Sequence, residues 1–155
     1  MSDAGARGLR DDRSGDAISA WASARGDRVV ERHIVPDQTV DIVRTLLAWC
    51  DGDRADVVLT TGGTGLSPRD VTPEATRKVI QRETPGLAEA MRAESLKKTP
   101  HAMLSRAVAS ICGHTLIVNL PGSPKGAVEN LQTVLPVLSH AVQLLTDDPK
   151  SEASH

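Results

Sequence analysis

The chain has 155 residues, a length typical of one domain that buries a core without disulfide or metal staples. Its composition, 39% hydrophobic and 25% charged, is that of an ordinary globular protein and excludes the disordered and fibrous classes. The net charge of -2 argues against nucleic acid or an anionic membrane surface as a partner, because those partners select clustered lysine and arginine.

The cysteines of the chain, Cys50 and Cys112, lie far apart in apolar surroundings. This placement favours reduced, buried thiols in a cytoplasmic protein over the disulfide framework of a secreted one. No apolar run reaches the length of about 20 residues that a membrane span needs, and the first residues lack the apolar core of a signal peptide. We therefore expect a cytoplasmic protein with no membrane segment.

The first part of the chain alternates between helical and extended patterns. Apolar residues at helical spacing predict a helix over residues 16–25, capped by Asp12 or Ser14. Branched apolar residues predict a short strand over residues 28–35, which a Pro-Asp pair ends. A second helix is predicted over residues 40–49.

The middle of the chain continues this alternation. Residues 56–61 form a continuous apolar run, as expected of a strand buried on both faces of a parallel sheet. A helix is predicted to begin at Thr72 and to end at Pro85-Gly86, after which another helix begins. Residues 107–111 and 115–120 flank a Gly-His pair and predict a hairpin, which adds an antiparallel edge to the sheet.

The last helical pattern begins at Lys125 and is amphipathic. Pro136 interrupts it, which predicts one kinked helix or two short ones. Residues 147–155 are polar, and terminal segments of that kind usually fray. The sequence shows no internal repeat or linker, so we expect one α/β domain followed by a flexible tail.

The strongest local signal for chemistry is the run Thr60-Thr61-Gly62-Gly63-Thr64-Gly65, which we call the glycine loop. It follows the predicted buried strand, where ligands of open α/β sheets bind. Glycines let bare backbone N–H groups approach a ligand closely, and such a turn makes a concavity for anions such as phosphate. A merely tight turn is the alternative. The loop matches neither the P-loop nor the dinucleotide-binding pattern.

A second loop, Asn119-Leu120-Pro121-Gly122-Ser123-Pro124, also follows an apolar strand and precedes a helix. Ser123 and the helix start beyond it can hold another anionic group, because helix starts present unpaired N–H donors. Alternatively, the loop is a rigid turn in which Ser123 caps the helix. Two such loops in one domain favour a ligand with separated phosphates.

Acidic residues accompany these loops: Asp70 and Glu74 follow the glycine loop, and Asp37 ends an earlier strand. Carboxylates with substrate phosphate oxygens are a common way to hold Mg²⁺, which offsets charge in phosphoryl transfer. For each acid alone, a helix cap or a solvated turn is the alternative. The histidines and cysteines lack zinc-ligand spacing, and no serine shows the nucleophile signature of a hydrolase.

The order and spacing of these motifs resemble the molybdopterin adenylyltransferase family of the MogA/MoaB type, to which the gephyrin G domain is similar. The resemblance extends from Ser2 to about Leu145, and the glycine loop joined to Asp-Val-Thr-Pro-Glu is its most specific part. The motifs that carry it are Ser2-Asp3, Asp12-Arg13-Ser14-Gly15, Pro36-Asp37, the glycine loop, Asp70-Val71-Thr72-Pro73-Glu74, Leu104-Ser105-Arg106 and the Asn119 to Pro124 loop.

The resemblance implies a three-layer α/β/α sandwich with a mostly parallel sheet and an antiparallel edge. Residues 1–146 would form the molybdopterin-binding domain and residues 147–155 the tail. The family assembles as a homotrimer, or in some members as a hexamer of two trimers. Its reaction joins molybdopterin to the adenylyl group of Mg-ATP and releases pyrophosphate, and a molybdenum-insertion protein is a possible further partner.

Carried over by motif, Asp37 and Asp70 would be the catalytic carboxylates and the Mg²⁺ ligands. The residues that would bind substrate are Asp3, Ser14, Gly62, Gly63, Thr64, Gly65, Glu74, Asn119, Gly122 and Ser123.

Two other functions compete with adenylyl transfer. The chain can be a molybdopterin-binding protein or scaffold without transfer activity, since fold does not establish chemistry. It can also be a related nucleotide hydrolase of the competence-damage type. The presence of both Asp37 and Asp70 favours the transferase over a pure binder, and the chain length favours a stand-alone transferase over the hydrolase.

One departure from the family concerns the N-terminus. Family members usually carry an apolar strand immediately before the Ser-Asp pair, and this sequence has Met1 at that point. A sheet without that inner strand would expose unpaired backbone groups. We therefore expect that the sequence has a misplaced start or a truncation at this point, which would affect the stability of the sheet and the placement of Asp3.

Overall fold

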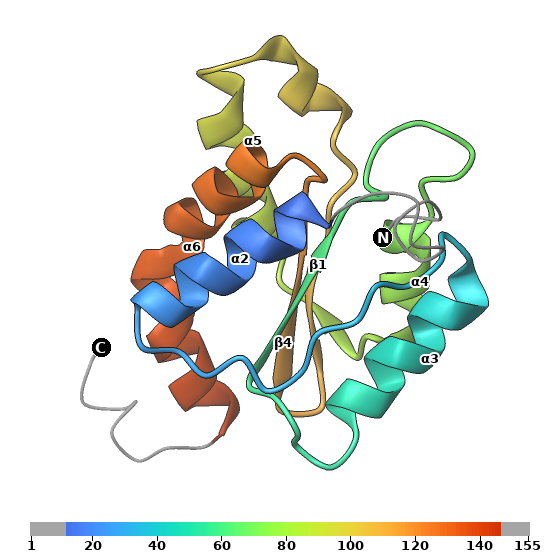
Figure 1. The fold of residues 1–155 in the computed structure, drawn as a ribbon, viewed down its shortest axis with the longest axis vertical. Helices are drawn as coiled ribbons and strands as arrows, with labels where there is room; N and C mark the ends of the chain where they lie inside the picture. The colour runs from blue at the N-terminus through green and yellow to red at the C-terminus, as the bar shows by residue number, and fades with distance from the viewer. Residues whose placement is uncertain (1–11, 147–155) are drawn as a thin grey trace.

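The computed structural model describes residues 12–146 and shows helices on both faces of one sheet (Figure 1). Asp3 and the expected tail of residues 147–155 lie outside the described residues. The elements in chain order are α2 (Arg13–Ala24), α3 (Thr39–Cys50), β1 (Val57–Thr61), α4 (Thr72–Val79), β2 (Arg82–Glu83), α5 (Pro85–Leu96), the 3-10 helix η1 (Pro100–Leu104), β3 (Ala109–Cys112), β4 (Thr115–Leu120) and α6 (Pro124–Leu145).

The described strands form one mixed sheet in the order β1-β4-β3-β2. β1 and β4 are parallel, with Thr61 opposite Leu120, whereas β3 is antiparallel to both of its neighbours. The expected hairpin is confirmed, and Gly113 turns it with a φ of 61°. The α/β class and the antiparallel edge are therefore confirmed. Within residues 12–146 the sheet is mixed, with one parallel pair, β1 and β4, and antiparallel pairs supplied by the hairpin and β2.

Alternation along the strands builds one core on each face of the sheet. Leu116, Val118 and Leu120 of β4 pack with α5 and α6, and α2 lies against the same core. Ile117 points to the opposite face and packs with buried residues of α3 and α4. Figure 1 shows the corresponding layers, with α2, α5 and α6 on one side of the sheet and α3 and α4 on the other. None of the helices between residues 12 and 146 is both long and apolar enough to cross a membrane.

The predicted strand over residues 28–35 is not formed. The segment is irregular, and Val29, Val30 and Ile34 are each close to half exposed. A strand is stable only when its backbone groups pair with a neighbouring strand. β1 is the edge strand of the described sheet, and segment 28–35 does not pair with it. Among the described residues, no strand lies between this segment and β1 to pair with either of them.

Smaller differences concern the helix boundaries. α4 ends at Val79 rather than at Pro85-Gly86, because the chain then forms β2 along the edge of β3. Pro85 begins α5, where its missing N–H needs no partner. α6 is a single helix of 22 residues that continues through Pro136, so the reading as two short helices is wrong.

Candidate active site

The two predicted loops meet at one edge of the sheet. β1 and β4 are parallel neighbours, so the segments that follow them emerge side by side. The Gly62 N–H donates to Leu120 O at 3.0 Å, and the Thr61 hydroxyl donates to Pro121 O at 2.8 Å. Gly122 lies so close to Gly62 that an added Cβ would be 3.4 Å from the Gly62 Cα. The glycine loop and the second loop are thus one connected surface.

The first half of the glycine loop is fixed by α4. Gly62 and Gly63 both have left-handed backbones, with φ of 88° and 69°. The Thr72 hydroxyl donates to Gly62 O at 3.0 Å, and the Thr72 N–H donates to Gly63 O at 3.1 Å. Thr72 approaches so closely that a Cβ on Gly63 would lie 2.3 Å from its hydroxyl oxygen. Only glycine fits this position without displacing Thr72.

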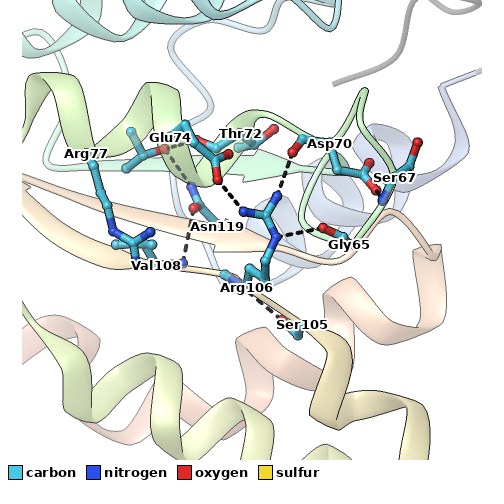
Figure 2. Close-up of polar contacts among 12 residues, drawn as sticks. Gly65, Ser67, Asp70, Thr72, Glu74, Arg77, Ser105, Arg106, Val108 and Asn119 are labelled. Carbon is cyan, nitrogen blue, oxygen red and sulfur yellow. Dashed lines mark hydrogen bonds and ion pairs between the residues drawn. The ribbon is translucent and has the colours of Figure 1, made fainter.

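The second half of the glycine loop is fixed by Arg106, which lies between η1 and β3. Its N–H donates to Thr64 O at 2.9 Å, and its Nε donates to Gly65 O at 2.8 Å. Its Nη2 donates to Asp70 O at 2.6 Å, and its Nη1 contacts the Glu74 carboxylate (Figure 2). The carbonyl groups of both halves of the loop are therefore bound by protein donors.

The N–H groups of the glycine loop are in a different state from its carbonyl groups. Those of Gly63, Thr64 and Gly65 form no hydrogen bond with any other described residue. A buried or half-buried N–H group without a protein acceptor is available to a ligand oxygen, and successive N–H groups of this kind form an anion-binding concavity. The carbonyl groups of the loop thus accept hydrogen bonds from the protein, and its N–H groups can donate hydrogen bonds to an anion.

Asp70 lies against the end of the glycine loop. Its Oδ2 accepts a hydrogen bond from the Ser67 N–H at 3.0 Å, and a Cβ on Gly65 would be 2.9 Å from the same oxygen. These contacts orient the carboxylate beside the loop, and Asp70 remains partly exposed. The arrangement leaves the second carboxylate oxygen, Oδ1, able to bind a ligand.

A groove of about 1650 Å³ extends along this edge of the molecule. It also passes between β1 and the irregular segment 28–35, under α2 and α3. Most of the predicted site residues line it, namely Ser14, Asp37, Gly62, Gly63, Thr64, Gly65, Asp70 and Gly122. The structure therefore brings together residues from four separate segments of the chain that the sequence motifs had singled out.

Known proteins share both the sequence and the fold. Residues 1–140 match the model of a probable molybdopterin binding domain. The molybdopterin adenylyltransferase of Helicobacter pylori strain J99 is 44% identical over 146 residues, which are 93% of this chain and 83% of that protein. This chain belongs to the molybdopterin adenylyltransferase family.

Two further comparisons agree with this family. The crystal structure of the molybdopterin biosynthesis enzyme MoaB from Thermus thermophilus has a TM-score of 0.88 and 53% identity, covering 96% of this chain and 93% of that one. The molybdenum cofactor synthesis protein cinnamon of Drosophila melanogaster is 50% identical over 116 residues, 75% of this chain. This region is only 19% of the Drosophila protein, so the comparison concerns one part of a longer chain. The expected MogA/MoaB-type family and its place in molybdenum cofactor biosynthesis are confirmed.

Three residues that were expected to contact the substrate, Asn119, Ser123 and Glu74, do not line the groove. Asn119 is fully buried: its Nδ2 donates to the hydroxyl groups of Thr60 at 2.9 Å and Thr76 at 3.1 Å, and its Oδ1 accepts from the Val108 N–H at 3.1 Å. Its side chain joins β1, α4 and the residue before β3, so both of its polar atoms have protein partners. The sequence motif singled out Asn119 but did not indicate these partners.

Ser123 and Glu74 also have protein partners. Ser123 caps α6, accepting a hydrogen bond from the Gly126 N–H at 3.2 Å, as the alternative reading of this residue expected. Glu74 pairs with Arg106, and this hydrogen bond lowers the pKa of the Glu74 carboxyl. Both residues remain close to the site without lining the groove.

The first turn of α2 brings Ser14 to the groove. Asp12 caps the helix by accepting from the Gly15 N–H at 3.0 Å, as expected, and Arg32 bonds the same carboxylate at 2.8 Å. This cap ties the start of α2 to the irregular segment. A Cβ on Gly15 would lie 2.1 Å from an Asp12 oxygen, so a side chain at this position would displace the carboxylate that caps the helix.

The donor set fits a magnesium ion only in part. In residues 12–146, no group of three or more His, Cys, Asp or Glu side chains is placed to hold a metal ion. Asp37 and Asp70 line the same groove, and Mg²⁺ is commonly held by one or two carboxylates together with substrate phosphates. The residues therefore fit an ion that arrives with a nucleotide rather than a permanent metal centre.

Arg106 and Thr72 are the functional residues that sequence reasoning missed. Both lie inside motifs that carried the family resemblance, but nothing in those motifs indicates which groups they bind. Arg106 reaches a loop that precedes it by 41 residues, and contacts over such a separation leave no periodic signal in the sequence.

Proposed function

We propose that this chain transfers the adenylyl group of ATP to the terminal phosphate of molybdopterin. The observation that carries the proposal concerns the N–H groups of Gly63, Thr64 and Gly65. They have no hydrogen-bond acceptor among the described residues, and these three residues line a groove with Asp37 and Asp70. Membership of the family and the name of the Helicobacter pylori relative support the same reaction.

The reaction is a substitution at phosphorus. An oxygen of the terminal phosphate of molybdopterin attacks the α-phosphorus of ATP and forms a new P–O bond. The bond from that phosphorus to the oxygen bridging to the β-phosphorus breaks, and pyrophosphate leaves. Such chemistry depends on positioning and on stabilising charge, with little covalent work for the protein.

Each part of the site has a task in this scheme. The N–H groups of Gly63, Thr64 and Gly65 bind phosphate oxygens and hold the nucleotide in the groove. Asp37 and Asp70 would hold Mg²⁺ together with the phosphates. When bound, this ion neutralises the charge that develops on the phosphate oxygens. Ser14 and Gly122 line the same groove and contact the pterin substrate.

The deciding experiment incubates the protein with molybdopterin, ATP and Mg²⁺ and follows adenylylated pterin and pyrophosphate. We expect both products in equal amounts, and none when Mg²⁺ is replaced by a chelator. Molybdopterin binding without either product would identify a binding protein or scaffold. Release of AMP in the absence of pterin would identify a nucleotide hydrolase.

The proposal extends to assembly and location. We propose a homotrimer, or a hexamer of two trimers, and exposed apolar side chains of α5 and η1 such as Leu96 and Met103 are available for subunit contacts. Analytical ultracentrifugation would measure the assembly directly. Cys50 and Cys112 are free buried thiols, which supports a cytoplasmic location where a molybdenum-insertion protein can receive the product.

A further inference from the structure

Arg106 connects the end of the glycine loop to the rest of the site. Its backbone and guanidinium groups donate to the carbonyl oxygens of Thr64, Gly65 and Asp70 at 2.9, 2.8 and 2.6 Å. Figure 2 shows the side chain reaching from the segment before β3 toward the loop, with its bonds fanning out in different directions. A planar guanidinium group can serve several acceptors at fixed angles, which makes these contacts a rigid template for the loop.

Glu74 is the fourth hydrogen-bond acceptor of Arg106. It lies in the first turn of α4, and its carboxylate contacts Arg106 Nη1. The Arg106 hydrogen bond lowers the pKa of the Glu74 carboxyl group and thereby favours its charged form. Because Nε and Nη2 bind neutral carbonyl groups, Glu74 is the group that balances the guanidinium charge.

Arg106 does not line the groove itself, and neither does Glu74. Its donors point to the carbonyl side of the loop. The Gly65 N–H group, which is available to an anion, lies on the opposite side of the peptide unit that contains Thr64 O. A peptide unit is planar, so fixing the direction of its carbonyl group also fixes the direction of the N–H group on the next residue. The Arg106 backbone N–H orients the Gly65 N–H group in this way by holding Thr64 O, and the side-chain Nε fixes the next peptide unit by holding Gly65 O.

We propose that Arg106, oriented by Glu74, is a positioning residue that holds the Gly65 N–H group of the glycine loop, and the backbone that carries the Asp70 carboxylate, in their binding geometry. The inference deepens the proposed function and rests on it for its kinetic consequences. It assigns Glu74 a supporting role through Arg106 in place of the substrate contact that the family resemblance implied.

The test compares Arg106→Lys with Glu74→Gln and with a matched control, Arg77→Gln. Arg77 also lies on α4 and also pairs with a glutamate, Glu83 at 3.3 Å, but it contacts neither loop. Lysine keeps the charge and the backbone bond to Thr64 O, but its ammonium group is a single point donor and cannot serve the separate side-chain acceptors Gly65 O, Asp70 O and the Glu74 carboxylate. All variants are first compared by circular dichroism and thermal unfolding, and assays are run well below the lowest midpoint.

The first readout is steady-state adenylylation. We expect Arg106→Lys to lower kcat/KM for ATP by about 10- to 100-fold, as is typical when a supporting contact of a site is removed. Glu74→Gln should show a smaller loss in the same direction, and Arg77→Gln should match the wild type. A folded Arg106→Lys protein that works as well as Arg77→Gln overturns the proposal.

The second readout does not depend on catalysis. Amide NMR signals of Gly63, Thr64 and Gly65 are followed while Mg-ATP is added to each protein. We expect these signals to shift in the wild type and in Arg77→Gln, and to need a higher ATP concentration in Arg106→Lys. If the wild type binds in this way but makes no product, the proposed function fails and the positioning role stands.

Two outcomes of the titration contradict the positioning role. One is the absence of any shift of the three amides in the wild type. The other is equal ATP affinity in Arg106→Lys and Arg77→Gln. Should Arg106→Lys fail to fold, Glu74→Gln decides, because it keeps every Arg106 contact with the loop and removes only the charged anchor. Equal binding and turnover of Glu74→Gln and Arg77→Gln then overturns the proposal.

Discussion

At Gly63, a left-handed backbone and a close neighbour each exclude a side chain. Its φ is 69°, and an added Cβ would lie 2.3 Å from the Thr72 hydroxyl. The left-handed conformation alone costs about 1–2 kcal/mol for an ordinary residue. The steric conflict adds to this cost because Thr72 must move, and Thr72 holds the carbonyl groups of Gly62 and Gly63.

We therefore predict that Gly63→Ala destabilises the protein more than Gly26→Ala. Gly26 has a φ of 83° and no atom within 4 Å of an added Cβ, so this variant isolates the cost of the backbone conformation. Urea unfolding should give a larger loss for Gly63→Ala, and only this variant should weaken Mg-ATP binding. Equal losses of stability would mean that Thr72 can move away from the added Cβ at no cost in free energy.

The second residue-scale prediction concerns Asp70. In Asp70→Asn, the side-chain oxygen can still accept from the Ser67 N–H, so the shape of the loop is kept while the charge is removed. We expect kcat to fall by about 100-fold, as when one stabilising group of a transition state is lost, with little change in molybdopterin affinity. Asp41→Asn, on the surface of α3, is the control and should leave kcat unchanged. A change confined to affinity would reassign Asp70 from chemistry to binding.

At the scale of elements, a buried amide holds the site's framework together. Asn119 of β4 bonds Thr60 of β1, Thr76 of α4 and the backbone of Val108, and it is fully buried. Polar groups in this position need partners, because an unsatisfied buried donor or acceptor costs about 1–3 kcal/mol. The two strands that carry the loops are thus fixed to each other and to α4 by one side chain.

Asn119→Ala should lower the free energy of unfolding by about 2 kcal/mol, since it removes the hydrogen-bond partner of the Val108 N–H group and of the Thr60 hydroxyl group. Ser110→Ala is a suitable comparison. Ser110 is also fully buried, in β3, but its hydroxyl forms no hydrogen bond within the described residues. This variant should be close to neutral. Chemical denaturation of the two variants measures the difference, and a small loss for Asn119→Ala would show that water replaces the amide.

At the scale of the whole molecule, β1 is the edge of the described sheet, and a groove separates it from segment 28–35. Segment 28–35 has the sequence of a strand and does not pair, which is the state expected of strand residues without a neighbour. We predict that amides of residues 28–35 exchange with deuterium faster than amides of β4, which pairs with a neighbour on each side. Hydrogen exchange followed by NMR measures the difference. Equal protection of the two segments would show that segment 28–35 pairs with another part of the chain.

Features that depend on contacts within a few residues were predicted from the sequence, and features that depend on distant contacts were not. Helices α2 and α3, the hairpin and the glycine loop follow from patterns within a few residues, and all were predicted with small errors in their ends. The strand over residues 28–35 was predicted from a correct local pattern and fails for lack of a neighbour. The roles of Asn119 and Arg106 depend on partners more than 30 positions away, and no local pattern specifies them.

The order in which the glycine loop is fixed has a consequence for how the protein becomes active during folding. Thr72 follows the loop within 10 residues and can close its first half while the chain is still largely unfolded. Arg106 comes 41 residues after Gly65 and reaches it only once α5, η1 and the start of β3 have docked. Affinity for nucleotide should therefore appear late in refolding, together with the last long-range contacts. Partly folded chains of this protein would be unable to sequester ATP.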